Sequence, residues 1–253
     1  FLVPTATRGA HAMFLAGHIP GARFFDIDAL SDTASSLPHM LPAAVKFTSG
    51  VKKLGVGDGK KIICYDSAGL FSAARCWWMF KVFGHDDVAV LDGGLPKWQR
   101  EGRALEDGPP GLVQERHFTP VLRASMVKSL ADVAKGLAEQ SIQVADARSG
   151  TRFRGEEPEP RPGVRPGHMP GARNVHYASL LSPDGTLKSR AELEAAFTSA
   201  GMDLEKPVVT SCGSGVTAGI LTLALTELGV RDHALYDGSW TEWGASDQTV
   251  VPG

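Results

Sequence analysis

The sequence predicts an α/β fold made of two tandem copies of one domain, each a mostly parallel sheet flanked by helices. Two segments 150 positions apart are nearly identical, GHIPGAR at 17–23 and GHMPGAR at 167–173. A longer stretch also repeats, because residues 61–69 align with residues 207–215. Each of these is followed by a helical stretch, a glycine, a short strand and an Asp-Gly pair. Order and spacing agree between the copies, so we infer an internal duplication.

Strands alternate with helices in each copy, which favours a largely parallel sheet. Short β-branched apolar runs are typical of strands buried on both faces. Gly84 and Gly229 directly follow the helical stretches, where a left-handed glycine commonly ends a helix. The expected strands are 62–65, 88–91, 208–211 and 233–236, and the expected helices are 70–83 and 216–228.

The two copies differ at their beginnings. In the second copy, a strand at 142–145 ends in Asp-Ala-Arg about twenty residues before Gly167. The first copy has only sixteen residues before Gly17, and none resembles that strand. We therefore expect the first copy to lack its first strand, through truncation or disorder, which leaves a sheet edge unpaired. The expected limits are an N-terminal domain without a nucleophile at 1–110, a linker at 111–122 that follows the Pro- and Gly-rich stretch 106–111, and a C-terminal catalytic domain at 123–253.

Composition and charge exclude several classes of function. The 253 residues include 26 Lys and Arg against 28 Asp and Glu, a net charge of −2, which argues against nucleic acid as a partner. No apolar run approaches the ~18 residues of a membrane span. Three scattered cysteines are too few for a disulfide framework or a zinc site, so we expect no metal, no cofactor and a reducing compartment: the cytoplasm, with the mitochondrion as an alternative. Cys64 and Cys76 lie in apolar surroundings and are expected in the core.

A candidate nucleophile lies in the second copy, in the sequence SCGSGVTA at 211–218. Cys212 follows a buried strand, at the sheet edge where ligands bind in parallel α/β folds. Gly213 and Gly215 let the backbone curl so that successive amides point to one place, and the following helix adds its positive end. We expect Cys212 to be ionised near neutral pH and hence nucleophilic, in a crevice between the two domains. The alternative is a small buried apolar side chain.

Several chemistries compatible with such a cysteine can be set aside. Tyrosine-type phosphatases need an arginine six positions after the cysteine to hold the phosphate, and that position is Ala218. Thioredoxin-like oxidoreductases show Cys-x-x-Cys, and here the second position is Gly215. What remains is one thiolate that accepts a group, such as a sulfur atom, and passes it on. The first copy has Asp66 at the position of Cys212, so only one domain has the nucleophile.

Together these segments resemble the two-domain rhodanese superfamily. Within it, the loop CGSGVTA is similar to that of the 3-mercaptopyruvate sulfurtransferases, whereas thiosulfate sulfurtransferases usually carry basic residues in this loop. The resemblance covers essentially the whole chain. It extends to the segments FFDID at 24–28, PHMLP at 38–42, RFRG at 152–155, EPEPR at 157–161 and YDGSW at 236–240.

The resemblance implies that Cys212 attacks the sulfur of 3-mercaptopyruvate, becomes a persulfide and releases pyruvate. A thiol acceptor such as thioredoxin, or cyanide, then takes the sulfur. Arg152 and Arg161 match the arginines that hold the keto acid, and a guanidinium fork suits a carboxylate–carbonyl pair. Gly213, Gly215, Val216 and Thr217 complete the implied substrate-binding set.

An alternative for these arginines is a solvated loop in which arginines and glutamates balance one another. Its members would be Arg152, Arg154, Arg161 and Arg165 with Glu156, Glu157 and Glu159.

Ser214, His39 and Asp28 match a Ser-His-Asp relay of the family, which would move the proton exchanged as substrate becomes pyruvate. The relay would also explain why the copy without the cysteine is retained, since it supplies two of the three residues. Packing or capping roles are the alternatives for all three. His18 and His168 recur in both copies, so we expect them to be structural.

Two other functions stay open. Thiosulfate can replace mercaptopyruvate as the donor with the same chemistry. The chain can instead be a sulfur carrier or thiol sensor, which forms a persulfide without turning over.

Overall fold

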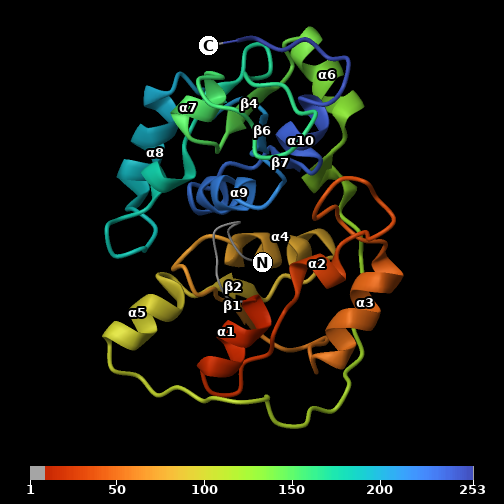
Figure 1. Cartoon of the computed structure of the whole chain (residues 1–253), viewed down its shortest axis with the longest axis vertical. Helices are drawn as coiled ribbons and strands as arrows, with labels where there is room; N and C mark the ends of the chain where they lie inside the picture. Colours follow the sequence, from red (N-terminus) through yellow and green to blue (C-terminus); the bar gives the residue numbers. More distant parts are fainter. Residues whose placement is uncertain (1–8, 253) are drawn as a thin grey trace.

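A computed structural model describes residues 9–252 and has the α/β architecture with largely parallel strands that the sequence predicts (Figure 1). The first half contains α1 (Ala10–Ala16), α2 (Ile27–Leu30), α3 (Ala44–Lys53), β1 (Ile62–Cys64), α4 (Ala73–Val82), β2 (Val88–Val90) and α5 (Gly94–Arg100). The second half contains the short 3₁₀ helix η1 (Ala124–Met126), β3 (Val127–Lys128), α6 (Leu130–Ala138), β4 (Gln143–Asp146), α7 (Gly150–Phe153), β5 (Arg173–Asn174), η2 (Tyr177–Leu180), α8 (Arg190–Ser199), β6 (Val208–Ser211), α9 (Ala218–Glu227), β7 (His233–Tyr236) and α10 (Ser239–Trp243).

The sheet of the second half has five parallel strands in the order β3-β7-β6-β4-β5. Successive residues of a strand point to opposite faces, and the packing follows that alternation. Val208 of β6 belongs to the cluster that contains α8 and α9, whereas Val209 belongs to the cluster that contains α6 and α10. Burial on both faces explains why β6 has two adjacent valines instead of an alternation of apolar and polar residues.

Helix ends follow the local chemistry. Gly84 and Gly229 have φ of +86° and +75°, so the glycines after α4 and α9 take the left-handed conformation predicted for them. Ser129 and Ser189 begin α6 and α8 with capping boxes, in which the serine and an acidic residue three positions later bond reciprocally. None of the helices within residues 9–252 has both the length and the apolar character needed to traverse a bilayer.

Within residues 9–252 the first half has only two strands, β1 and β2, which pair in parallel. They correspond to β6 and β7, so the edge of β1 away from β2 corresponds to the edge that β4 covers in the second half. Ile63 on β1 is 48% exposed, and a groove of about 690 Å³ lies there. The prediction of a missing first strand also concerns residues 1–8, which lie outside the described part of the chain. The predicted domain limits remain a prediction.

The two halves pack through α4 and α9, which lie against each other at the middle of the molecule (Figure 1). The helices approach closely because Gly219 has no side chain: a Cβ there would lie 3.0 Å from the main chain of Ala74 and Arg75. One apolar cluster includes residues of both halves. The aspartates of the repeated Asp-Gly pairs also cross over, since Asp92 accepts the amide of Leu187 and Asp237 accepts the amide of Leu41.

Candidate active site

Cys212 directly follows β6, at the carboxyl edge of the sheet, as predicted. The start of α10 holds it there. The Cys212 carbonyl accepts from the amide of Trp240 at 2.9 Å, and the Cys212 amide donates to Ser239 Oγ at 3.2 Å. Ser239 has a φ of +50°, an uncommon conformation for a residue with a side chain, and is fully buried. The backbone of the cysteine is therefore fixed by main-chain and hydroxyl groups of α10.

The loop after Cys212 presents unused main-chain donors. Within residues 9–252, none of the amides of residues 213–217 donates a hydrogen bond to a protein group. Gly215 has a φ of +79°, and a Cβ there would lie 2.8 Å from the carbonyl oxygen of Asp237, so glycine is required. Free amides at the start of α9 are suited to an anion.

The equivalent loop of the first half is filled by its own carboxylate. Asp66, at the position of Cys212, accepts hydrogen bonds of 2.8 Å from the amides of Ala68, Phe71, Ser72 and Ala73. The duplication thus offers an internal comparison. The same strand–loop–helix unit binds an anion within the chain in one half and leaves its donors unpaired in the other.

The structure buries Cys212 more deeply than the predicted crevice implies, and in this respect it agrees with the alternative of a small buried side chain. Cys212 is only 2% exposed, so its thiol does not face an open crevice. The reason is that the loop is enclosed on several sides. Arg152 lies against Gly213, with a guanidinium nitrogen 3.2 Å from where a Cβ would be, and Arg75 lies in the same way against Gly215. The main chain of α10 closes a further side.

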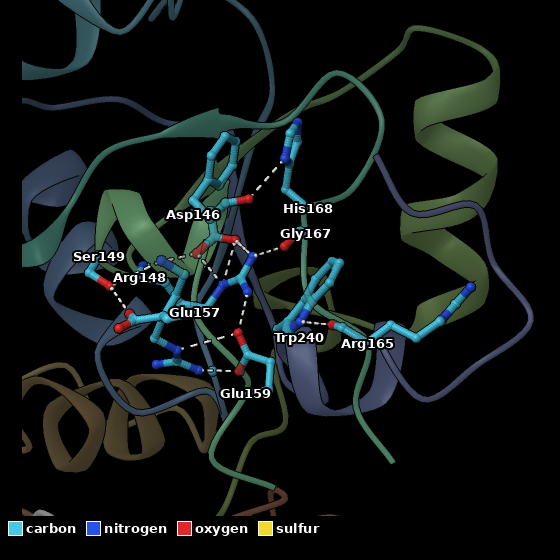
Figure 2. A network of polar contacts seen from close by, with 12 residues as sticks. Asp146, Arg148, Ser149, Glu157, Glu159, Arg165, Gly167, His168 and Trp240 are labelled. Carbon is cyan, nitrogen blue, oxygen red and sulfur yellow. Dashed lines mark hydrogen bonds and ion pairs between the residues drawn. The ribbon is translucent and has the colours of Figure 1, made fainter. Parts of the chain in front are cut away.

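Arg152 lies against the loop and is held there by Glu159. Glu159 in turn belongs to a buried network with Arg148 and Asp146 (Figure 2). Glu159 accepts from Arg152 Nε at 3.3 Å and also from Arg152 Nη2, and it accepts from Arg148 Nη1 at 2.8 Å. Arg148 is in turn paired with Asp146 at 2.7 Å and stacks over the ring of Trp240 at 4.2 Å. The expected alternative of a solvated loop fits Arg154 and Glu156, which form an exposed pair, but not Arg152.

His39 and Asp28, both from the first half, are in contact. His39 Nδ1 lies 2.7 Å from Asp28 Oδ1; the histidine side chain is 9% exposed and the aspartate 60% exposed. Burial lowers the pKa of His39, and the Asp28 carboxylate partly offsets this by raising it. The positive charges of Arg161 and Arg75 lower it further, so Arg161 of the second half is within electrostatic range of His39. The imidazole is thereby kept neutral near pH 7.

The predicted residues fall into two groups around one interface. Cys212, Gly213, Ser214, Gly215, Val216 and Thr217 share one loop, with Arg152 against it. His39, Asp28 and Arg161 form the second group. Arg75 links the two, because it donates both to the carbonyl of His39 and to the carbonyl of Gly215. Among residues 9–252 there is no cluster of His, Cys, Asp or Glu that could hold a metal.

Four residues of this arrangement escape the sequence analysis: Arg75, Asp146, Arg148 and Asp237. Glu159 was named there only as a member of a solvated loop, whereas it is buried and pairs with Arg148 and Arg152. Asp146 and Arg148 end a strand of the second copy, and Asp237 belongs to the repeated Asp-Gly pair. The sequence therefore shows these three residues in motifs, but it does not show which residues they pair with. The histidines that recur are structural, as predicted. His18 bonds the carbonyl of Phe14 and stacks on its ring, and His168 does the same with Phe153.

Cys64 and Cys76 pack in or against the apolar core, as predicted, with their sulfurs 3.4 Å apart. Burial raises the pKa of Cys76 well above its usual range, so this thiol is not a nucleophile at neutral pH.

Comparison with known proteins decides the family. A model of the rhodanese-like domain matches residues 7–101 and 129–246. The chain belongs to the rhodanese family. This rhodanese is 48% identical to the 3-mercaptopyruvate sulfurtransferase of Escherichia coli (strain K12), over 94% of this chain and 85% of that protein. It is 40% identical to the mitochondrial thiosulfate/3-mercaptopyruvate sulfurtransferase 1 of Arabidopsis thaliana, over 98% of this chain and 71% of that one.

The fold of this rhodanese is also that of solved relatives. The crystal structure of SseA from Escherichia coli, described as a 3-mercaptopyruvate sulfotransferase with the rhodanese fold, aligns with a TM-score of 0.87 at 44% identity. That alignment covers 95% of this chain and 90% of SseA.

Proposed function

We propose that this rhodanese is a 3-mercaptopyruvate sulfurtransferase, with Cys212 as the nucleophile. The observation that carries the proposal is the loop that follows Cys212, whose amides have no protein acceptor while those of the equivalent loop are occupied by Asp66. The similarity of the whole chain to proteins named for this activity supports 3-mercaptopyruvate as the donor.

The first half-reaction transfers one sulfur atom. The Cys212 thiolate attacks the thiol sulfur of 3-mercaptopyruvate, an S–S bond forms and the C–S bond breaks with its electron pair on carbon. The resulting pyruvate enolate takes a proton at that carbon and leaves as pyruvate. The thiol proton of the substrate supplies the balance, so Cys212 is left as a persulfide anion that the amides of residues 213–217 can stabilise.

The second half-reaction restores the enzyme. A thiol acceptor, for which thioredoxin is our candidate, attacks the outer sulfur of the persulfide and takes it, and Cys212 leaves as a thiolate. Cyanide would take the same sulfur as thiocyanate. Both steps conserve electrons, so no further oxidant or cofactor is needed.

Ser214, His39 and Asp28 are proposed to move the proton from the substrate thiol to the enolate carbon. The contact between His39 and Asp28 supports this, because the carboxylate orients the imidazole. The neutral state of His39 near pH 7 suits it as the acceptor in such a transfer. Ser214 lies two residues after Cys212 in the same loop and is nearly buried.

Arg152 and Arg161 are proposed to hold the carboxylate and carbonyl of the substrate. Arg152 lies against the backbone of Gly213 and Arg161 lies near His39, so the two cations lie at the two groups of predicted site residues. Because Cys212 is 2% exposed, we infer that substrate entry requires the side chains over the loop to shift.

Intact mass after incubation with 3-mercaptopyruvate tests the intermediate. We expect a gain of one sulfur atom, reversed by cyanide or a thiol and absent in Cys212→Ser. That substitution is nearly isosteric and should keep the fold. Persistence of the added sulfur in Cys212→Ser would refute the assignment.

A second candidate donor is thiosulfate, since the Arabidopsis relative is named for both donors. Turnover with each donor, with cyanide as acceptor, separates the two, and a clear preference for thiosulfate would overturn our choice. A sulfur carrier or sensor would instead form the persulfide without multiple turnover.

For location we propose a reducing compartment, the cytoplasm first and the mitochondrion second. The described cysteines are free thiols, which supports this. Fractionation of the source cells, followed by immunodetection, tests it, and recovery in an oxidising compartment would refute it.

A further inference from the structure

A buried arginine of the first half connects the two groups of residues assigned to the reaction. Arg75 lies on α4, at the interface with α9, and is completely buried. One of its terminal nitrogens, Nη2, donates to the carbonyl of His39 at 2.5 Å. The other, Nη1, donates to the carbonyl of Gly215 at 3.3 Å and to Asp237 Oδ1 at 2.6 Å. Its guanidinium plane also packs 4.4 Å from the ring of Trp78.

Asp237 completes the connection from the other side. It is 4% exposed, and its second oxygen accepts the amide of Leu41, two residues after His39, at 2.6 Å. The loop that carries His39 is thus held at two points, by Arg75 of its own half and by Asp237 of the second half. Both contacts are to main-chain atoms, so they set where the loop lies without involving the imidazole.

His39 itself needs such support. Its φ is +60°, a strained conformation for a non-glycine residue that persists only when surrounding contacts impose it. The Arg75 bond to the His39 carbonyl is a contact of this kind. The other terminal nitrogen of Arg75 donates to the carbonyl of Gly215, which belongs to the loop whose free amides follow Cys212.

We propose that Arg75 is a positioning residue of the sulfurtransferase reaction, which holds the main chain of His39 at a fixed distance from the loop of Cys212. The proposal rests on the function proposed above, and it deepens that function by assigning a role to a residue that touches neither substrate nor sulfur. The link depends on a forked side chain, because two different nitrogens of Arg75 reach the two carbonyls, whereas the three N–H donors of a lysine all leave one nitrogen.

The test is Arg75→Lys, measured in the full chain with 3-mercaptopyruvate and cyanide. The charge beside Asp237 is kept and the two-carbonyl link is lost. We expect kcat to fall by about 10- to 100-fold, as misplacement of a reacting group by about an ångström does. KM should stay near the parental value, because Arg152 and Arg161 are untouched. The acid limb of the kcat profile, set by His39, should flatten, since the imidazole no longer serves the step that limits the rate.

A purely structural role predicts a different result: a lower amount of folded enzyme with the parental KM, pH profile and kcat per folded molecule. Arg190→Lys is the matched control. Arg190 also donates to two main-chain carbonyls, those of Glu227 and Leu228, but at the far end of α9. It should leave kcat and the pH profile unchanged. A parental kcat, or a parental acid limb with reduced kcat, in Arg75→Lys would overturn the proposal.

If Arg75→Lys does not fold, the double variant Arg75→Met with Asp237→Asn replaces it, because it leaves no unpaired buried charge and keeps an acceptor for the Leu41 amide. The same loss of kcat is expected. If neither variant folds, Arg75 acts on the fold and the proposal is abandoned. Failure of the unmodified protein to form a Cys212 persulfide would instead refute the proposed function, whatever Arg75 does.

Discussion

Replacing Arg152 by alanine separates substrate binding from folding. The guanidinium contributes to the fold through Glu159, but Glu159 keeps its 2.8 Å bond to Arg148 when Arg152 is lost, so the buried carboxylate stays paired. We therefore expect the melting temperature of Arg152→Ala to change little. Substrate would lose one charge-assisted contact, worth about 1.5–3 kcal/mol, which corresponds to a rise in KM of about 10- to 150-fold.

Steady-state release of pyruvate at varied 3-mercaptopyruvate measures this change. Arg154→Ala is the control, because Arg154 is two positions away and forms an exposed pair with Glu156. It should leave KM unchanged, since exposed pairs contribute little. The reasoning is refuted if Arg152→Ala keeps the parental KM, or if both variants raise it equally.

Two further predictions concern the first half. In Asp28→Asn, removal of a carboxylate that raises the pKa of His39 lets burial dominate, so the pKa falls further and the acid limb of the kcat profile should move to lower pH; a limb that stays or moves upward contradicts this. In Asp66→Ala, four main-chain amides lose their acceptor, so the free energy of unfolding should fall by at least about 1.5–3 kcal/mol in urea denaturation while KM is unchanged. A stability equal to that of the parent would show that water replaces the carboxylate without cost.

Local sequence patterns were sufficient to predict where the main strands and helices of the repeated unit lie. The strands 208–211 and 233–236 have the predicted limits. The first is rich in β-branched residues, which favour strands, and the second follows the glycine that ends α9. The predicted helices 70–83 and 216–228 are shorter in the structure, at Ala73–Val82 and Ala218–Glu227. Their first residues instead form the loops that curl around Asp66 and Cys212, a use of the backbone that helical periodicity cannot reveal.

The site was predictable only where a motif marks it. The glycines around Cys212 indicate a loop with free amides, and the structure has one. The pairing of Arg152 with Glu159 was expected only as part of a solvated loop, and its burial depends on the tertiary fold. The contact of Arg75 with the main chain of His39 could not be predicted, because the fold alone brings the two together. A buried Cys212 was only the alternative in the sequence analysis, because the sequence does not show that Arg152 and Arg75, from two different halves, close over the loop.

The carboxylate of Asp66 affects which of the two halves can bind a free anion. A loop that already carries a tethered anion is permanently inhibited, since no free ligand competes with a group on the same chain at that effective concentration. The first half thus has a carboxylate at the position of the proposed nucleophile, and this carboxylate holds its own loop in a fixed turn. Its remaining task is to present side chains to its twin, so neither half alone is expected to be an enzyme.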